Sequence, residues 1–252
     1  ARSGRYQTLK SIKEDRVEQS IEKYKSDNEE STAKLTKKPM KRNVPNFRHL
    51  IFSPQVDKGV YKKHLLLVHS GLIYSTQFLK GPSDKFLETK QITLADVPST
   101  SNSRPSNRKT LVLDLDETLI KSCPGATDYD KLAFAKKDGQ TFQIPFKIRP
   151  YTQHFINKLK PYYEILVFTA SMKHYAEAII EILDPEGSIT YILDRSYCLE
   201  TKNGYAIKDL RIIKNRELKN MLIVDNLVHS FGLQLENGIP ILEWNGEKED
   251  SE

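Results

Sequence analysis

The amino-acid sequence predicts an α/β protein built on a doubly wound, Rossmann-like parallel sheet with β-hairpin insertions. Three features of residues 109–252 support this prediction. Short apolar runs alternate with helix-like segments, which is typical of parallel βαβ units. The first run, "TLVLDLD", contains two acidic residues at its end. Two other stretches turn at Asp-Gly and Asn-Gly pairs, which are strong hairpin signals.

The expected elements follow from this alternation. Strands are expected at "TLVLDLD" (110–116), "EILVFTA" (164–170), "NMLIVDN" (220–226) and "IPILEW" (239–244), with helices at "YTQHFINKLKPYY" (151–163) and "MKHYAEAIIEIL" (172–183). The two hairpins are expected to turn at Asp138-Gly139 and Asn203-Gly204 and to line a substrate cleft.

A helical, partly extended region is expected before the sheet. Residues 1–46 are expected to form a basic, partly disordered leader with one amphipathic helix, in which Val17, Ile21 and Tyr24 repeat at helical spacing. Residues 47–108 form a small helical adaptor that ends in the Pro-, Ser- and Asn-rich linker "PSTSNSRPSNR". The α/β domain then spans 109–252.

The charge is distributed unevenly between these regions. Residues 1–110 contain 22 Lys and Arg against 11 Asp and Glu, whereas residues 111–252 contain 17 against 22. The net charges are therefore +11 and −5, and we expect residues 1–108 to dock on an acidic protein surface or a multiprotein assembly. A solvated leader without a partner is the alternative. Nucleic acid is a less suitable partner because aromatic residues are not interleaved with the basic ones.

The composition points to a reduced, intracellular protein. Its two cysteines, Cys123 and Cys198, are far apart and form neither a disulfide framework nor a zinc motif. No apolar run approaches the roughly 20 residues that span a bilayer. The first residue is Ala1, so the start of the sequence does not reveal the compartment. A nuclear or cytoplasmic place, cytoskeletal assemblies included, is expected ahead of a mitochondrial one.

Three of the expected strands end in polar or acidic residues. Asp114 and Asp116 lie at the end of the first, Thr169 at the end of the second, and Asp225 with Asn226 at the end of the third. The carboxyl ends of parallel strands meet at one edge of a sheet, where ligands bind. As an alternative, Thr169 alone is an ordinary turn or cap residue. The two neighbouring acids need another explanation, because like charges this close are costly without a cation or a raised pKa.

Mg²⁺ is the cation that fits best, because it takes oxygen ligands from one or two carboxylates and from phosphate. Asp114 and Asp225 are expected to share it. Asp114 then attacks phosphorus to form an aspartyl phosphate, while Asp116 acts as acid and then as base. Thr169 and Lys208 are expected to bind the phosphoryl oxygens.

The motifs "DLDETL", "FTAS", "KDL" and "VDN", in this order, resemble the haloacid dehalogenase superfamily. The phrases "KIRPY", "YEILVFTAS" and "VHSFGLQLENGIPI" are similar to its C-terminal-domain phosphatase branch, the small CTD phosphatase or NLI-interacting-factor-like family. The resemblance implies that residues 109–252 form a phosphatase domain. It implies the following roles: nucleophile Asp114, acid/base Asp116, support Thr118, phosphate binding Thr169 and Lys208, metal binding Asp114, Asp225 and the Asp116 carbonyl, and additional site residues Asn226 and Arg195.

The resemblance implies phosphoserine and phosphothreonine protein substrates, the tail of RNA polymerase II being the best-known case. The chain departs from the family in two places: "DNLVHSF" replaces a "DNSP"-like continuation, and only eight residues follow Trp244, where the family adds a last helix. We therefore expect either that this helix is absent or that the chain is incomplete. The alternatives are a non-catalytic scaffold or receptor module, and a small-molecule phosphatase, for which the large cap domain is missing.

Overall fold

The computed structural model describes residues 68–69, 71–75, 79, 84–95, 109–202 and 204–250. These residues belong to one compact unit, Val56–Glu252. The predicted leader, its amphipathic helix, the linker and Asn203 lie outside the described residues.

A five-stranded sheet forms the centre of this unit, and every strand pair in it is parallel, as predicted. In spatial order its strands are β10 (Gly238–Pro240), β9 (Met221–Asp225), β1 (Lys109–Leu113), β5 (Tyr163–Phe168) and β6 (Ile189–Leu193). The first strand in sequence is thus the middle strand in space, with neighbours on both sides.

Both faces of the sheet are covered, so the prediction of a doubly wound fold is confirmed. Successive residues of β1 point to opposite faces, and Leu111 and Leu113 join one core cluster while Val112 joins the other. The helices α5 (Thr152–Leu159) and α6 (Lys173–Leu183) contribute side chains to the first cluster. The second face is covered by short 3₁₀ helices and by residues that precede the sheet in sequence.

The 3₁₀ helices are brief and lie in the connections between the strands. They are η3 (Arg195–Tyr197), η4 (Leu210–Ile212), η5 (Leu218–Asn220), η6 (Val228–Phe231) and η7 (Leu235–Asn237). No helix of the described residues has the length and apolarity needed to cross a membrane.

The described part of residues 68–95, which we call the upstream segment, contributes to the second face. Residues 71–75 are helical, and α4 (Asp84–Lys90) follows. Ile92 then forms a parallel bridge with Ile213. The upstream segment therefore packs on the α/β body within the same compact unit.

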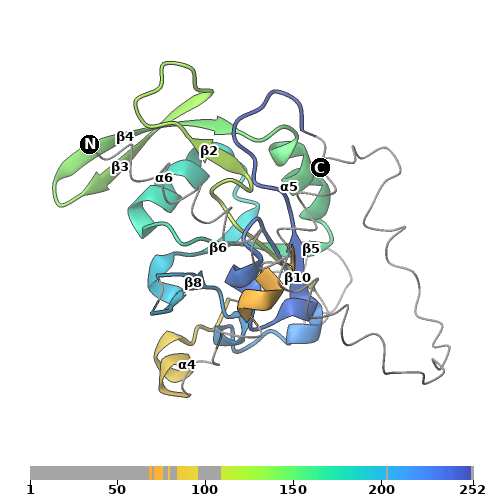
Figure 1. The fold of residues 1–252 in the computed structure, drawn as a ribbon. Coiled ribbons are helices and arrows are strands. Elements are labelled where there is room, and N and C mark those ends of the chain that lie inside the picture. Colours follow the sequence, from red (N-terminus) through yellow and green to blue (C-terminus); the bar gives the residue numbers. More distant parts are fainter. Residues whose placement is uncertain are drawn as a thin grey trace, which may run out of the picture. The chain divides into compact units, whose positions relative to one another are not determined.

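The first insertion is the hairpin of β3 (Lys131–Lys137) and β4 (Gln140–Ile148). It turns where predicted, with Asp138 and Gly139 at φ 50° and 77°, the positive angles that tight hairpin turns require. A short strand, β2 (Ile120–Ser122), pairs with β4 to complete a three-stranded sheet. Figure 1 shows the β3–β4 hairpin extending away from the central sheet.

The second insertion is the hairpin of β7 (Leu199–Glu200) and β8 (Ala206–Ile207). Gly204 lies in its turn at φ 79°, as the predicted Asn-Gly turn requires.

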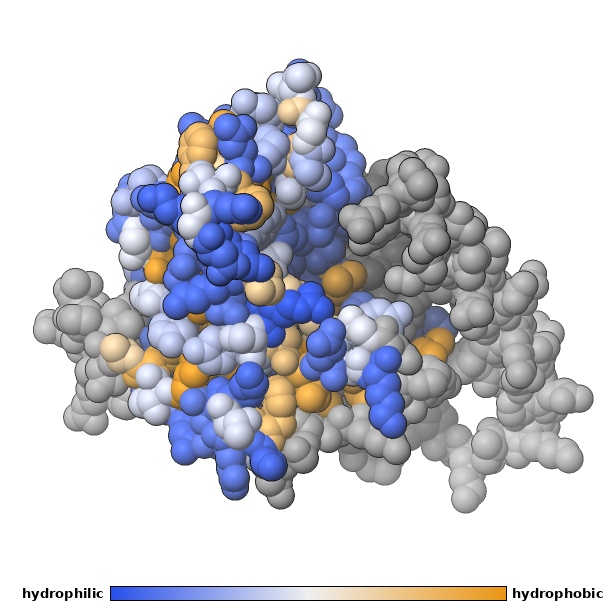
Figure 2. Space-filling view, turned by 90° about the vertical axis from the view of Figure 1, so that its left-hand side faces the viewer, coloured by the Kyte–Doolittle hydropathy of each residue, from blue (hydrophilic) through white to orange (hydrophobic). Residues whose placement is uncertain are grey.

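The surface shown in Figure 2 is mostly hydrophilic, with small groups of apolar residues between the polar ones.

Several elements differ from the prediction, among them β1, which ends at Leu113 instead of residue 116, and β2, which was not expected. Strand β6 was not expected, and β10 stops at Pro240, so the segment 241–244 is not a strand. Instead, the Trp244 N–H donates to the Glu117 carbonyl at 2.9 Å. Helix α5 ends at Leu159 instead of residue 163, because Pro161 has no backbone N–H with which to continue the helical hydrogen bonds.

Candidate active site

The site lies at the carboxyl ends of the three central strands. Leu113, the last residue of β1, is in register with Val167 of β5 and Val224 of β9. Asp114 directly follows β1, and Asp225 is the last residue of β9. The parallel register therefore brings these two aspartates to the same edge of the sheet.

The chain leaves β1 in a tight loop, residues 114–119, which we call the acidic loop. Strand β1 ends at Leu113. The Asp114 N–H still donates to Val224 O of β9 at 2.9 Å, and the chain then turns, with the Leu119 N–H donating to Leu115 O at 2.9 Å. Glu117 has a left-handed φ of 61°, which costs of order 1–3 kcal/mol in a residue other than glycine. The two acids consequently do not project in parallel from a regular strand, and each has its own partners.

Both carboxylate oxygens of Asp114 accept hydrogen bonds. The Thr118 hydroxyl donates to Oδ2 at 2.9 Å, and the Lys208 ammonium donates to Oδ1 at 2.5 Å. The same ammonium donates to Asp225 Oδ2 at 2.6 Å. Asp114, Lys208 and Asp225 are 6%, 2% and 0% exposed, so they form a buried ion triad.

This triad contains two carboxylates and one ammonium, which leaves one negative charge uncompensated. Burial alone would lower the pKa of Lys208, but the adjacent Asp114 and Asp225 outweigh that effect and hold it above its usual range. Burial raises the pKa of Asp225, against the opposing influence of Lys208. A cation bound at this place would be stabilised by the remaining charge.

Asp116 has separate partners. The Ser171 hydroxyl donates to Oδ2 at 2.7 Å, and the Tyr175 hydroxyl donates to Oδ1 at 2.5 Å. Burial raises the pKa of Asp116, whereas these hydrogen bonds from Tyr175 and Ser171 act in the opposite direction. Two acids that are neighbours in sequence thus have different environments, an arrangement typical of a nucleophile beside a proton donor.

Two further predicted residues, Asn226 and Thr169, lie at this edge. Asn226 is 3% exposed, and its Oδ1 lies 3.4 Å from the Thr118 hydroxyl. Thr169 is 1% exposed, and its hydroxyl accepts from the Ser171 N–H at 3.0 Å. Thr169 is therefore also a turn-forming residue, which was the alternative reading of its sequence position.

Arg195 lies close to the loop that follows β5, outside the ion triad. Its N–H donates to Ser171 O at 2.9 Å, and its side chain donates to Ala170 O at 3.3 Å. The guanidinium also forms an exposed ion pair with Glu200 at 3.1 Å. No contact of Arg195 with the aspartates is present among these interactions, so its predicted phosphate-binding role stays a prediction.

Sequence reasoning missed several residues that hold the acids in place. Ser171 enters the sequence analysis only as part of the "FTAS" motif and Tyr175 only as part of the helix expected at 172–183, although two hydroxyl residues four positions apart are a weak signal of a shared partner. Arg149, 5% exposed, donates to the Thr118 carbonyl at 3.3 Å and to both oxygens of Asp250. Together with Trp244, it ties the acidic loop to the segment that follows β10.

The residues present fit Mg²⁺. Within the described residues, no group of three or more His, Cys, Asp or Glu side chains could hold a metal ion. Mg²⁺ does not need such a group, because it is commonly bound by one or two carboxylates together with waters and phosphate oxygens. The hard oxygens of Asp114 and Asp225, with their excess negative charge, match that requirement.

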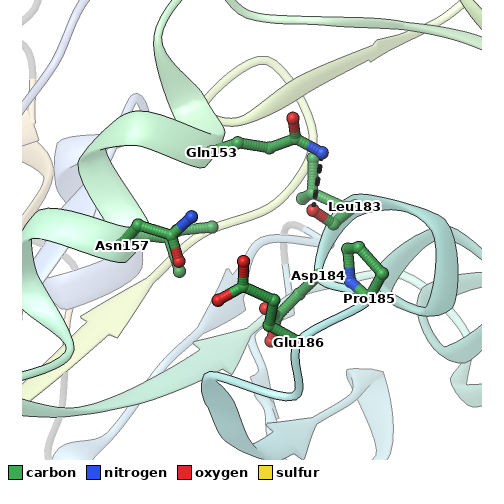
Figure 3. Close-up of a pocket in the computed structure, with 7 residues that line it drawn as sticks. Gln153, Asn157, Leu183, Asp184, Pro185 and Glu186 are labelled. Atoms are coloured by element: carbon green, nitrogen blue, oxygen red, sulfur yellow. Dashed lines mark hydrogen bonds between the residues drawn. The ribbon is translucent and has the colours of Figure 1, made fainter.

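A separate pocket lies between α5 and the end of α6 (Figure 3). Gln153 crosses it and donates to the Leu183 carbonyl at 3.3 Å. The remaining lining residues are Ile156, Asn157, Asp184, Pro185 and Glu186. None of them is a predicted site residue, so this pocket is not part of the acidic site.

A middle parallel strand followed by Asp-x-Asp-x-Thr, with a lysine and another aspartate around the first acid, fits one class of protein, the haloacid dehalogenase superfamily. Residues 109–252 match the family described as NLI interacting factor-like phosphatase. The chain belongs to this family.

The chain is also similar to individual proteins. The chain is 36% identical to CTD small phosphatase-like protein 2 of Dictyostelium discoideum, over 62% of this chain and 27% of the relative. It is 38% identical to CTD small phosphatase-like protein 3 of Caenorhabditis elegans, over 60% and 52%. A solved structure of fission yeast RNA polymerase II CTD phosphatase Fcp1 is 22% identical, with a TM-score of 0.45, over 55% and 42%. The chain thus spans about half or less of these relatives.

Proposed function

We propose that this chain is a Mg²⁺-dependent protein serine/threonine phosphatase that acts through an aspartyl phosphate on Asp114. One observation carries the proposal: a carboxylate fixed at both oxygens by Thr118 and Lys208 lies beside a second acid with its own hydrogen-bond partners. A nucleophile needs such fixed orientation, and a neighbouring proton donor needs a different environment.

In the first step, an Asp114 oxygen attacks phosphorus, and the bond from phosphorus to the seryl or threonyl oxygen breaks. Asp116 gives its proton to that leaving oxygen. Burial raises the pKa of Asp116, so the acid holds this proton to a higher pH than an exposed aspartic acid does. The products of this step are the free hydroxyl side chain and phosphorylated Asp114.

In the second step, water attacks phosphorus and transfers a proton to the Asp116 carboxylate. The bond between phosphorus and the Asp114 oxygen then breaks, which releases inorganic phosphate and restores both acids. Lys208 contributes positive charge to the phosphoryl oxygens throughout, and Thr169 a hydrogen bond. Bound Mg²⁺, held by Asp114, Asp225 and the Asp116 carbonyl, would add a second positive charge to these oxygens.

The substrate is proposed to be a phosphorylated segment of a protein. The relatives are named for phosphatases of this kind, and the described insertions are two small hairpin sheets instead of a cap domain. Without a cap domain over it, such a site is accessible to an extended polypeptide segment. The basic residues 1–108 are proposed to hold the enzyme on an acidic protein surface or in a multiprotein assembly, which would raise the local substrate concentration.

Asp114→Asn is the decisive test, because it removes the nucleophile and keeps the side-chain shape. Hydrolysis of an aryl phosphate and of a phosphoserine peptide should fall at least about a thousandfold. The control is Asp138→Asn in the β3–β4 turn, where asparagine tolerates the left-handed conformation. Retention of a tenth of the wild-type rate would refute the mechanism. Full activity in excess chelator would refute the Mg²⁺ requirement, and an inactive wild-type chain would favour the scaffold alternative.

A further inference from the structure

The upstream segment lies outside the family domain, which begins at residue 109, yet it packs on the core beneath the site. Its apolar side chains join the second core cluster, which also contains residues from β1, β5 and β9. The contributing residues are Val68, Phe86, Leu87, Ile92 and Leu94. The upstream segment is therefore an additional element that packs on the second face of the central sheet.

The upstream segment approaches η6 very closely. A Cβ atom placed on Gly71 would lie 2.2 Å from Val228 Cβ, and one placed on Gly232 would lie 2.2 Å from Ser75 Oγ. Only glycine permits such contact at both positions. The Ser75 hydroxyl donates to Gly71 O at 2.7 Å, which fixes its direction.

Three aromatic rings meet next to this contact. The ring of Tyr74 lies 4.6 Å from that of Tyr205 and 5.6 Å from that of His229, and the latter two are 4.5 Å apart. All three pairs are edge-to-face, the favoured geometry for aromatic rings. The Tyr74 hydroxyl also donates to Thr201 Oγ1 at 3.3 Å. We call Tyr74, Tyr205 and His229 the ring cluster.

The ring cluster joins the two stretches of chain that hold Lys208. Tyr205 immediately precedes β8, and Lys208 immediately follows it. His229 precedes Ser230 in η6, and the Lys208 N–H donates to Ser230 O at 2.6 Å. Tyr74 therefore contacts one residue near each end of the main-chain hydrogen bond between Lys208 and Ser230. This hydrogen bond fixes the main chain from which the Lys208 side chain extends into the ion triad.

We propose that Tyr74 is a positioning residue that fixes Lys208, and through it the Asp114 carboxylate, by clamping the β7–β8 hairpin to η6. Its catalytic consequence rests on the proposed function. The far end of the upstream segment has a separate attachment: the Ile92 N–H donates to Ile212 O at 2.8 Å, and Leu94 exchanges two hydrogen bonds with the Asn215 side chain. Loss of the ring cluster thus loosens the clamp and leaves the segment bound.

The test compares Tyr74→Ala with Tyr74→Phe in the full chain. Residue-resolved hydrogen exchange of the Lys208 amide, measured without substrate, should be about tenfold faster in Tyr74→Ala, because the bond to Ser230 opens more often. Tyr74→Phe keeps the ring and should exchange like wild type. The Leu166 amide of β5 and the variant Tyr162→Ala, a tyrosine that is 71% exposed, serve as controls.

A double-mutant cycle with Lys208→Ala tests the catalytic consequence. Tyr74→Ala should lower kcat for an aryl phosphate about tenfold when Lys208 is present and less than twofold when it is absent. An unchanged Lys208 amide in Tyr74→Ala would overturn the positioning role, and so would equal losses of kcat in both backgrounds. The exchange result needs no turnover, so it decides the positioning role even if the chain proves to have no phosphatase activity.

Discussion

Replacing Lys208 with methionine should destabilise the protein strongly. The ammonium contacts Asp114 at 2.5 Å and Asp225 at 2.6 Å, and all three side chains are at most 8% exposed. Methionine fills a similar volume without charge, so two buried carboxylates would face each other unpaired. Breaking a buried ion pair from one side costs about 3–5 kcal/mol. We expect a loss of that size in the free energy of unfolding at pH 8 in a chelating buffer.

The pH dependence of this loss has a definite sign. In Lys208→Met, Asp225 loses the ammonium that opposes the effect of burial on its pKa, so this pKa stays raised and the folded state takes up a proton at a higher pH than the unfolded chain does. Stability of the variant therefore rises as the pH falls toward the unfolded-state value near 4. The difference from wild type should be largest above pH 7 and shrink progressively below it. Adding Asp225→Asn should recover part of the loss at pH 8, because one of the two charges is gone.

Urea unfolding followed by circular dichroism between pH 5 and 8 measures both quantities. The control is Lys219→Met, because Lys219 forms only a surface ion pair with Glu217 and is 75% exposed; this change should stay within about 0.5 kcal/mol of wild type. A Lys208→Met protein within 1 kcal/mol of wild type at pH 8, or a difference that did not depend on pH, would refute the ion triad as described.

Two further predictions concern the proton donor and the leader. In Ser171→Ala and Tyr175→Phe, the pKa of Asp116 should rise, because each change removes a hydrogen bond that lowers it; the alkaline limb of the pH–rate profile for a phosphoserine peptide should move to higher pH. An unshifted or down-shifted limb would assign that limb to another group. Deleting residues 1–44 should leave aryl phosphate turnover unchanged and weaken association with an acidic partner in pull-downs, and the association of the full chain should itself weaken at high salt, because exposed charges are screened. Loss of small-substrate turnover would instead place the leader in the catalytic fold.

Much of the α/β architecture could be predicted because buried parallel strands have a strong local signature. Strand β1 has four consecutive buried residues after Lys109, and β5 has five after Tyr163. Strand β6 escaped prediction because it is an edge strand with the weak pattern Ile189–Leu193, in which only Leu193 is fully buried. The hairpins were found because Asp138-Gly139 and Gly204 need backbone angles that few other residues adopt.

The candidate site was predictable where chemistry and strand ends coincide, as at Asp114 and Asp225. Partners that act only through a hydroxyl were not predictable. Ser171 and Tyr175 lie 55 and 59 positions from Asp116 in sequence, and serine and tyrosine at the start of a helix have many ordinary roles. Tyr74 is similar, because a tyrosine before the linker looks like an ordinary core residue until the three rings are seen together.

The central place of β1 has a consequence for protein synthesis. Asp114 leaves the ribosome roughly 110 residues ahead of Asp225, a delay of about 5–20 s at about 5–20 residues per second. For most of that interval the apolar strand β1 lacks its neighbour β9, and Asp114, which follows the strand, lacks its partner Lys208. A nascent chain must therefore shield this strand before its partners exist, and growing cells should show transient chaperone contact that peaks before β9 emerges and ends once Asp225 can pair.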